Sequence, residues 1–121
     1  MKYTETHEWV ELKDGIATIG VTQYAQKELG DIVYVELPKV GKAVKAGEEA
    51  AVLESTKAAA DVYAPISGTI FEVNLKLNDA SELVNQSPES QGWLFKLKPS
   101  NLAEVEQLMD EATYRAKLPQ A

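Results

Sequence analysis

Glu54-Ser55-Thr56-Lys57-Ala58 is the stretch of sequence that best indicates the fold. Strand-forming apolar runs lie on both sides of it, at residues 50–53 and 61–65. Two such runs around a short polar segment predict a β-hairpin over about residues 50–64, with Lys57 at the turn. A lysine there presents a primary amine on a flexible four-carbon stem, held away from the body of the protein. The same pattern is typical of an ordinary surface lysine, so the turn alone does not decide the function.

Most of the chain outside this hairpin is also strand-like. The turn signal Asp14-Gly15 separates residues 6–12 from residues 16–21 and predicts a second hairpin. Thr22 can cap a short helix that ends at Gly30. Further short strands are predicted at residues 32–37, 43–44, 68–73 and 92–97.

The C-terminal segment differs from the strand-rich body. Asn101 followed by Glu104 is a capping-box pattern, which predicts a helix over about residues 101–116. Its apolar residues fall on one helical stripe that we expect to pack on the body of the domain: Leu102, Val105, Leu108, Met109 and Ala112. A β-rich body with short helices and a terminal helix indicates an α+β protein that is mainly β.

Length and composition limit the classes of protein that fit. A chain of 121 residues predicts one domain, residues 1–121, and a monomer is the simplest expectation. The net charge of −7 argues against nucleic-acid binding, which needs a basic surface. No apolar run is long enough to cross a membrane, and the N-terminus has no signal-peptide character. We therefore expect a cytoplasmic protein, or a mitochondrial matrix protein if the chain is a mature organellar form.

Few residues of the chain suit catalysis or metal binding. There is no cysteine, so disulfides, thiolate metal sites and iron–sulfur clusters are excluded. The single histidine, His7, is predicted on a strand without the partners of a catalytic triad or a metal site. No phosphate-binding glycine motif is present. An amine at a turn without catalytic groups indicates a carrier that is not itself an enzyme.

Several blocks of the sequence resemble the H proteins of the glycine cleavage system. The segment at residues 54–68 resembles their lipoyl-attachment segment, and other similar blocks follow the family's order along nearly the whole chain. These blocks are His7-Glu8-Trp9-Val10, residues 17–22, residues 24–26, Leu29-Gly30-Asp31-Ile32-Val33, residues 35–38, Glu82-Leu83-Val84-Asn85 and residues 92–99.

The resemblance implies a fold and a function. The fold would be the barrel-sandwich hybrid of lipoyl and biotinyl carriers. Lipoic acid would be joined by an amide to Lys57, in the attachment turn that Glu54, Ser55, Thr56 and Ala58 form around it. The carrier would take an aminomethyl group from glycine decarboxylase, a pyridoxal phosphate enzyme, to an aminomethyltransferase that uses tetrahydrofolate. Dihydrolipoamide dehydrogenase would reoxidise it, and a lipoate ligase or octanoyltransferase would attach the lipoyl group.

The resemblance also implies a cleft for the loaded arm. In the family this arm folds back onto the surface, which shields an adduct that water would hydrolyse. By motif matching, the cleft of this chain would involve residues 6–9, Glu28 and Asp61. The candidate residues for contact with the arm are Thr6, Glu8, Glu28 and Asp61, of which Glu8 and Asp61 would accept the cationic amine. The alternative is that these carboxylates are plain surface residues.

The chain departs from the family pattern at four places. Thr56 stands where valine is common, Ala60 where serine is usual, and Ser81 where proline is frequent. Residues 88–92 also differ from the usual loop, and this change near Glu89 could alter contact with a partner. Thr56 is β-branched like valine, so we expect the hairpin geometry to hold.

Other carriers and a non-carrier protein are alternatives. A lipoyl domain of a 2-oxo acid dehydrogenase has a similar lysine turn, but it is usually shorter and continues into Ala/Pro-rich linkers. A biotin carrier places methionines beside its lysine, whereas Lys57 lies between Thr56 and Ala58. A scaffold that kept the fold without the modification is the alternative from another class. A role in relaying lipoyl groups to other enzymes is compatible with the H-protein reading.

Overall fold

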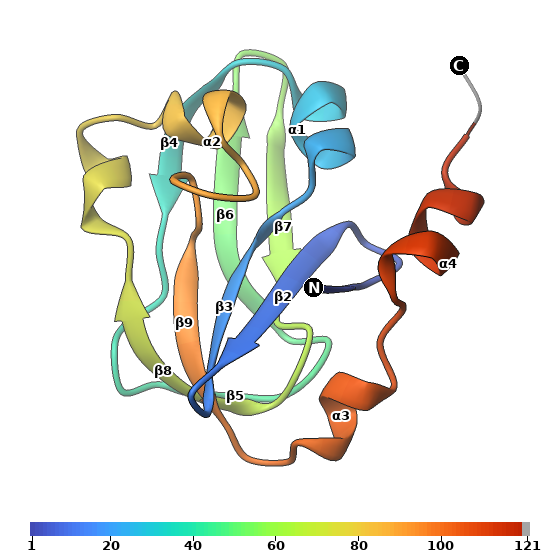
Figure 1. Ribbon diagram of the computed structural model, residues 1–121. Coiled ribbons are helices and arrows are strands. Elements are labelled where there is room, and N and C mark those ends of the chain that lie inside the picture. Colours follow the sequence, from blue (N-terminus) through green and yellow to red (C-terminus); the bar gives the residue numbers. More distant parts are fainter. Residues whose placement is uncertain (120–121) are drawn as a thin grey trace.

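The computed structural model describes residues 1–119, which form two antiparallel β-sheets packed face to face with short helices around them (Figure 1). The larger sheet has six strands in the order β1 (Lys2–Tyr3), β2 (Glu8–Lys13), β3 (Ile16–Val21), β9 (Phe95–Pro99), β8 (Gly68–Val73) and β5 (Ala43–Val44). The smaller sheet has the order β4 (Ile32–Glu36), β6 (Glu49–Ser55) and β7 (Ala59–Tyr63). The expected mainly β, barrel-sandwich fold is confirmed.

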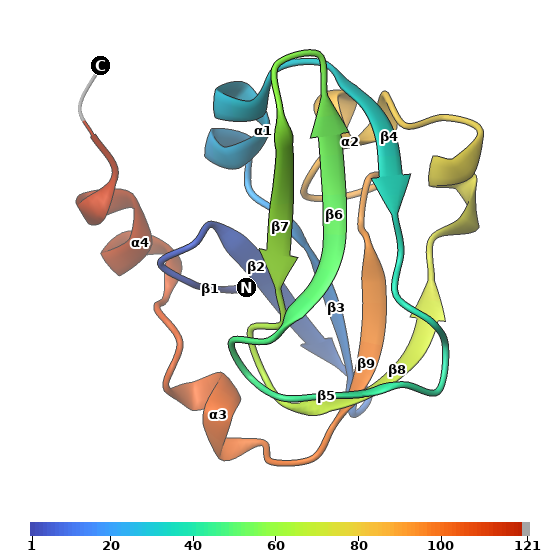
Figure 2. The same cartoon turned by 180° about the vertical axis from the view of Figure 1, so that it is seen from behind.

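The two hairpins predicted from the sequence are both present. β2 pairs with β3 around Asp14 and Gly15, which have φ values of 52° and 80°. Positive φ at both central residues is what this kind of two-residue turn needs. β6 pairs with β7, and their turn contains Lys57. Figure 2 shows this second hairpin as a long ribbon that reaches the end of the molecule beside α1 (Gln23–Leu29).

The hydrophobic core lies between the two sheets. Its largest fully buried side chains come from both of them: Ile19, Leu53, Ile70, Phe95 and Leu97. Helix α1 closes one end through Ala25 and Leu29, which pack against this core. As predicted, Thr22 begins the helix, where its hydroxyl accepts from the N–H of Ala25, and Gly30 ends it. Two shorter helical segments, η1 (Leu75–Asn78) and α2 (Leu83–Gln86), connect β8 to the loop before β9.

A glycine lets three strands of the large sheet meet. Gly68 begins β8 and pairs with Val44 on one side and Pro99 on the other. A Cβ at this position would overlap the backbone oxygen of Lys98 and lie 2.9 Å from Leu97 Cδ1. The absence of a side chain at Gly68 therefore sets how closely β8 approaches β9.

The C-terminal segment corrects a prediction. The sequence predicts one helix over residues 101–116, but the structure has two short ones, α3 (Ala103–Glu106) and α4 (Glu111–Lys117). Met109 interrupts the helix because its backbone exchanges two hydrogen bonds with Tyr3 of β1, at 2.8 and 3.0 Å. Asp110 then caps α4 by accepting from the N–H of Thr113. The predicted stripe is thus divided: Val105 is buried, whereas Leu102 and Ala112 are exposed.

Glu104 also has a different role from the one that its spacing predicts. Asn101 does accept from the N–H of Ala103 at the start of α3. Glu104, however, accepts hydrogen bonds from the N–H and the hydroxyl of Ser67, at 2.8 and 3.2 Å. It therefore fixes α3 to the turn before β8 and does not complete a capping box. Among residues 1–119, no helix is both long and apolar enough to span a membrane.

Candidate functional site

Ser55 shapes the turn that carries Lys57. Its hydroxyl oxygen accepts from the N–H groups of Lys57 and Ala58, at 3.1 Å each, and its own N–H donates to the carbonyl of Ala58. Serine side chains hydrogen-bond the backbone of tight turns in this way. Lys57 is exposed at the tip, and within residues 1–119 its ammonium makes no hydrogen bond or ion pair.

The tip of the hairpin contacts the rest of the protein, which refines the prediction that the amine is held away from the body of the protein. The N–H of Thr56 donates to the carbonyl of Asp31 at 3.1 Å. The stem of Lys57 lies over Gly30, where a Cβ would be 3.4 Å from Lys57 Cε. Gly30 has φ of +82°, a conformation that favours glycine. The connection between α1 and β4 is therefore a platform under the lysine.

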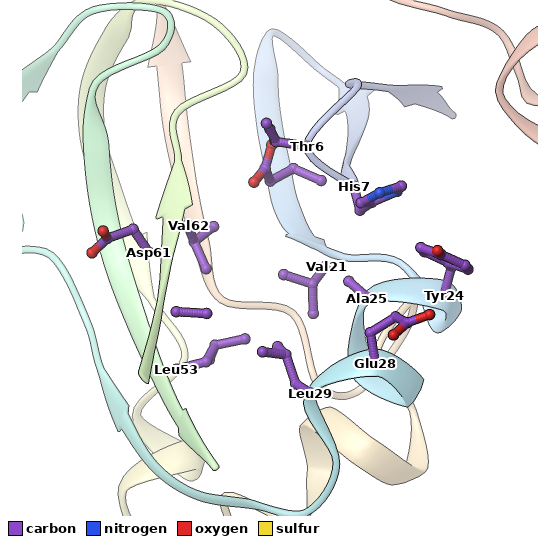
Figure 3. A pocket seen from close by; sticks show the side chains of 12 residues that line it. Thr6, His7, Val21, Tyr24, Ala25, Glu28, Leu29, Leu53, Asp61 and Val62 are labelled. Atoms are coloured by element: carbon purple, nitrogen blue, oxygen red, sulfur yellow. The ribbon is translucent and has the colours of Figure 1, made fainter. Parts of the chain in front are cut away.

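A cavity of about 190 Å³ lies beside this platform, between α1, the start of β2 and the hairpin β6–β7 (Figure 3). Leu29, the residue before Gly30, is one of its walls. The other apolar walls include Val21, Leu53 and Val62. All four residues proposed for contact with the arm line it: Thr6, Glu8, Glu28 and Asp61. The fold thus brings together side chains from three segments far apart in the sequence.

Glu8 is the buried acidic group of this cavity. It is 2% exposed, and one carboxylate oxygen accepts from the hydroxyls of Thr4 and Thr6. The other oxygen lies 3.4 Å from the N–H of Tyr63. Burial raises the pKa of the Glu8 carboxyl above its ordinary value, and these hydrogen bonds oppose that effect. Glu28 and Asp61, by contrast, are exposed at the rim.

The raised pKa of Glu8 predicts a pH-dependent stability. The folded state binds the Glu8 proton more tightly than the unfolded chain, so this residue makes stability fall as pH rises from about 4.5 through the raised pKa. Glu8→Gln keeps an oxygen for the two threonine hydroxyls and removes the titration. We expect its stability relative to wild type to improve as pH rises through this window, measured by urea denaturation. Glu11→Gln, an exposed carboxylate on the same strand, is the control, and a Glu8→Gln difference that is constant with pH would contradict the assignment.

His7 is placed differently from the prediction. It lies in the turn before β2 and not on a strand, with φ of 71° and its carbonyl accepting from the N–H of Thr22. Its Nδ1 is 2.8 Å from the hydroxyl of Tyr114 on α4, which is 2.7 Å from Thr22 Oγ1. Burial lowers the pKa of His7, against the effect of the nearby Glu28 carboxylate. The imidazole therefore lines the cavity and connects it to α4, and its burial favours the neutral form.

The side chain of Trp9 does not line the cavity, although the cleft was expected to involve it. Trp9 packs with Tyr3 and Tyr114 in a second cluster of buried side chains. Its indole N–H donates to the carbonyl of Pro88 at 2.9 Å. Successive side chains of a strand point to opposite faces, so Glu8 and Trp9 belong to different sides of β2.

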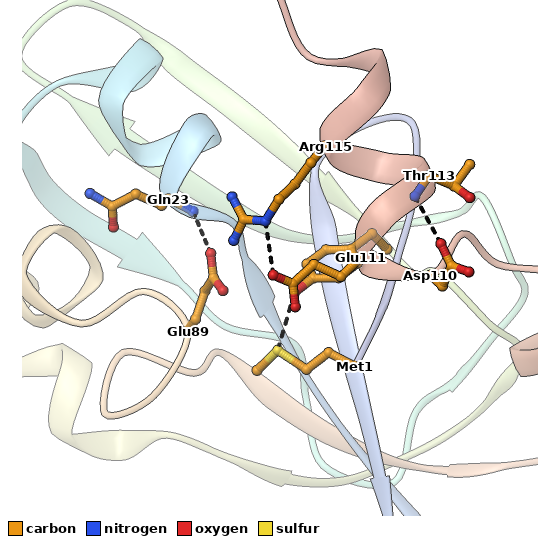
Figure 4. A network of polar contacts seen from close by, with 8 residues as sticks. Met1, Gln23, Glu89, Asp110, Glu111, Thr113 and Arg115 are labelled. Carbon is orange, nitrogen blue, oxygen red and sulfur yellow. Dashed lines mark hydrogen bonds and ion pairs between the residues drawn. The ribbon is translucent and has the colours of Figure 1, made fainter.

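Glu89 has a structural role that the sequence did not reveal. Its carboxylate accepts from the N–H of Gln23 at 2.9 Å, at the start of α1 (Figure 4). Arg115 lies nearby and pairs with Glu111 at 2.8 Å on α4. The loop at residues 88–92 therefore holds the helix that forms one wall of the cavity. In residues 1–119, no three His, Cys, Asp or Glu side chains are grouped in a way that suits a metal ion.

A two-sheet sandwich with an exposed lysine on a hairpin, next to a partly apolar cavity, has the arrangement expected of a carrier domain for a covalently attached group. The whole chain, residues 1–121, matches the family described as Glycine cleavage H-protein. The chain belongs to this family, and its resemblance to it is confirmed. It is therefore a lipoyl carrier of the glycine cleavage system.

Relatives from several bacteria support this assignment. The chain is 58% identical to the glycine cleavage system H protein of Thermotoga maritima, over 94% of this chain and 92% of that protein. It is 51% identical to the one from Acinetobacter baumannii, over 98% of this chain and 95% of that protein. The crystal structure of the H protein from Mycobacterium marinum superposes with a TM-score of 0.88 at 37% identity, covering 96% of this chain and 94% of that one.

Proposed function

We propose that Lys57 is the residue that carries the lipoyl group, joined through an amide to Nζ. The observation that supports this most is the exposed amine at the end of the β6–β7 hairpin, without a polar partner among residues 1–119. The residues fit such a group, because acylating this amine removes no native ion pair. When bound, the lipoyl group supplies a disulfide ring whose sulfur holds the one-carbon unit in transit.

We propose that the cavity receives the far end of this arm. Its apolar walls exclude water from a carried group, and such shielding suits an adduct that water destroys. Glu8 lies at the floor with Asp61 at the rim, and both carboxylates are acceptors for a cationic amine. An ammonium group beside Glu8 would favour the ionised carboxylate and offset the cost of its burial. Thr6 keeps one oxygen of Glu8 oriented.

The finer parts of the functional assignment are proposals as well. The chain acts as a non-catalytic, monomeric carrier in the cytoplasm. Its partners are glycine decarboxylase, an aminomethyltransferase, dihydrolipoamide dehydrogenase, and a lipoate ligase or octanoyltransferase. One attachment point lets a single arm reach successive active sites at high effective concentration, so the unstable unit need not diffuse freely. The net charge of −7 suits partner surfaces that are positive around their active sites.

The attachment proposal is tested by the mass of the protein produced in cells that are supplied with lipoate. We expect a species heavier by one lipoyl group, and fragment masses that locate the group on Lys57. A group located on any other lysine would overturn the assignment.

The cavity proposal predicts a shorter lifetime for the loaded carrier when Glu8 is removed. Glu8→Ala is expected to accelerate the loss of the carried one-carbon unit to water about tenfold, since a charge-assisted hydrogen bond to the amine is lost. The measurement is the release of formaldehyde from loaded protein over time. Glu11→Ala, on the same strand but exposed, should release it at the wild-type rate. Equal rates in Glu8→Ala and wild type would count against the cavity as the shelter.

A further inference from the structure

Asn85 of α2 makes three hydrogen bonds that hold the end of α1 against the start of β4. Its side-chain oxygen accepts from the N–H of Ile32 at 2.8 Å. Its amide nitrogen donates to the carbonyl of Gly30 at 2.8 Å and to Gln26 Oε1 at 3.0 Å. One side chain therefore satisfies backbone groups on both sides of Asp31.

This connection is the same platform on which the lysine hairpin rests. The carbonyl of Asp31 accepts from the N–H of Thr56, and Gly30 lies under the stem of Lys57. Of the two residues that contact the hairpin tip, Gly30 is held directly by Asn85, and Asp31 lies between the two backbone groups that Asn85 holds. Asn85 is therefore linked to the N–H of Thr56 through the backbone of residues 30–32, with no flexible side chain between them.

Ser81 adds a fourth contact to the platform. Its hydroxyl donates to the carbonyl of Ile32 at 3.1 Å. The chain therefore has two polar side chains, both from the segment around α2, that fix the backbone beneath the lysine.

We propose that Asn85 is a positioning residue that presents Lys57 to the enzyme that attaches the lipoyl group. The inference rests on the proposed attachment at Lys57. An attaching enzyme must bind the hairpin tip in one conformation, and a tip that is already ordered needs less ordering on binding. When the bound conformation is only partly populated, apparent affinity falls by that fraction. Asn85 acts through the Gly30–Ile32 backbone and does not touch the reacting amine.

The test compares Asn85→Asp with Asn74→Asp. Aspartate keeps the acceptor for Ile32 N–H but places an oxygen against the Gly30 carbonyl, so that hydrogen bond is lost, whereas the amide of Gln26 can turn to donate to the new oxygen. Asn74 is a matched control, because it is buried and its amide nitrogen donates to the carbonyls of Gln91 and Trp93, away from the hairpin. With a lipoate ligase, lipoate and ATP, we expect Asn85→Asp to raise the KM for the carrier about tenfold with little change in kcat. Asn74→Asp should keep the wild-type KM.

A second measurement uses the unmodified protein and does not depend on the ligase. Exchange of the Thr56 amide hydrogen with solvent, followed by NMR, should be faster in Asn85→Asp and unchanged in Asn74→Asp. Ser81→Ala, a milder change at the same platform, should also raise the KM for the carrier and the exchange rate of the Thr56 amide. It keeps the test available if Asn85→Asp fails to fold.

The outcomes separate this inference from the attachment proposal. A wild-type protein that the ligase does not modify on Lys57 would refute the attachment, and the Thr56 exchange rates would still decide whether Asn85 orders the tip. Unchanged KM and exchange in folded Asn85→Asp, or in Ser81→Ala if Asn85→Asp does not fold, would overturn the role of Asn85. Equal increases in the KM and in the Thr56 exchange rate for Asn85→Asp and Asn74→Asp would also overturn it, because they would indicate general destabilisation.

Discussion

Replacing Lys57 with arginine is expected to abolish lipoylation completely. The guanidinium of arginine keeps its charge at any physiological pH and offers no free amine for an amide bond. The substitution preserves the positive charge and most of the stem that lies over Gly30, so the hairpin should remain folded. The intact mass of Lys57→Arg, produced with lipoate and a ligase, should match the unmodified chain.

A second exposed turn lysine provides the control for this prediction. Lys45 lies on the turn before β6, and like Lys57 it is exposed. Lys45→Arg should therefore carry one lipoyl group, as wild type does. If Lys57→Arg still gained a group, or Lys45→Arg failed to gain one, the attachment point would have been assigned to the wrong turn.

Gly68→Ala is expected to cause the largest loss of stability among the glycine substitutions of the strands. The new methyl group would overlap the backbone oxygen of Lys98 and press on Leu97, a fully buried core residue. Because backbone atoms cannot rotate away, β8 and β9 must separate. We expect a loss of about 3 kcal/mol in the free energy of unfolding, at the upper end for inserting a methyl group into a packed site. Urea denaturation measures it.

Gly41→Ala separates this clash from the general effect of losing a glycine. Gly41 has φ of +94°, and a Cβ there would meet no atom within 4 Å. The cost of placing alanine in the left-handed region is about 1 kcal/mol. The loss for Gly68→Ala should exceed the loss for Gly41→Ala clearly. Similar losses would show that the β8–β9 approach relaxes easily.

The parts of the fold that were predictable from the sequence are those with local signals. The Asp14-Gly15 turn, the Thr22 cap and the end of α1 at Gly30 each depend on residues within a few positions of one another. The C-terminal helix was predicted wrongly because its interruption depends on a partner far away. Met109 pairs with Tyr3, and no pattern near Met109 indicates that bridge.

The candidate site also combines residues with local sequence signals and residues whose role depends on distant partners. The turn residues around Lys57 could be inferred from a short stretch, whereas the cavity residues came only from the resemblance to a family. Asn85, Glu89 and Tyr114 were missed because each acts over a long sequence separation, on Ile32, Gln23 and His7 respectively. The sequence around these residues has no signature of such contacts, since their partners are mostly backbone groups or a single ring. Asn85 and Tyr114 lie on the short helices α2 and α4, and Glu89 lies in a loop.

The exposed and unpartnered amine of Lys57 has a consequence for maturation. Because the ammonium makes no hydrogen bond or ion pair among the described residues, the protein can complete its folding before it meets the attaching enzyme. The proposed acylation of Lys57 would change the formal charge from −7 to −8, that is, −7 minus one lost positive charge, and would break no ion pair of residues 1–119. Unmodified protein can therefore accumulate in its native state until the lipoyl group is attached.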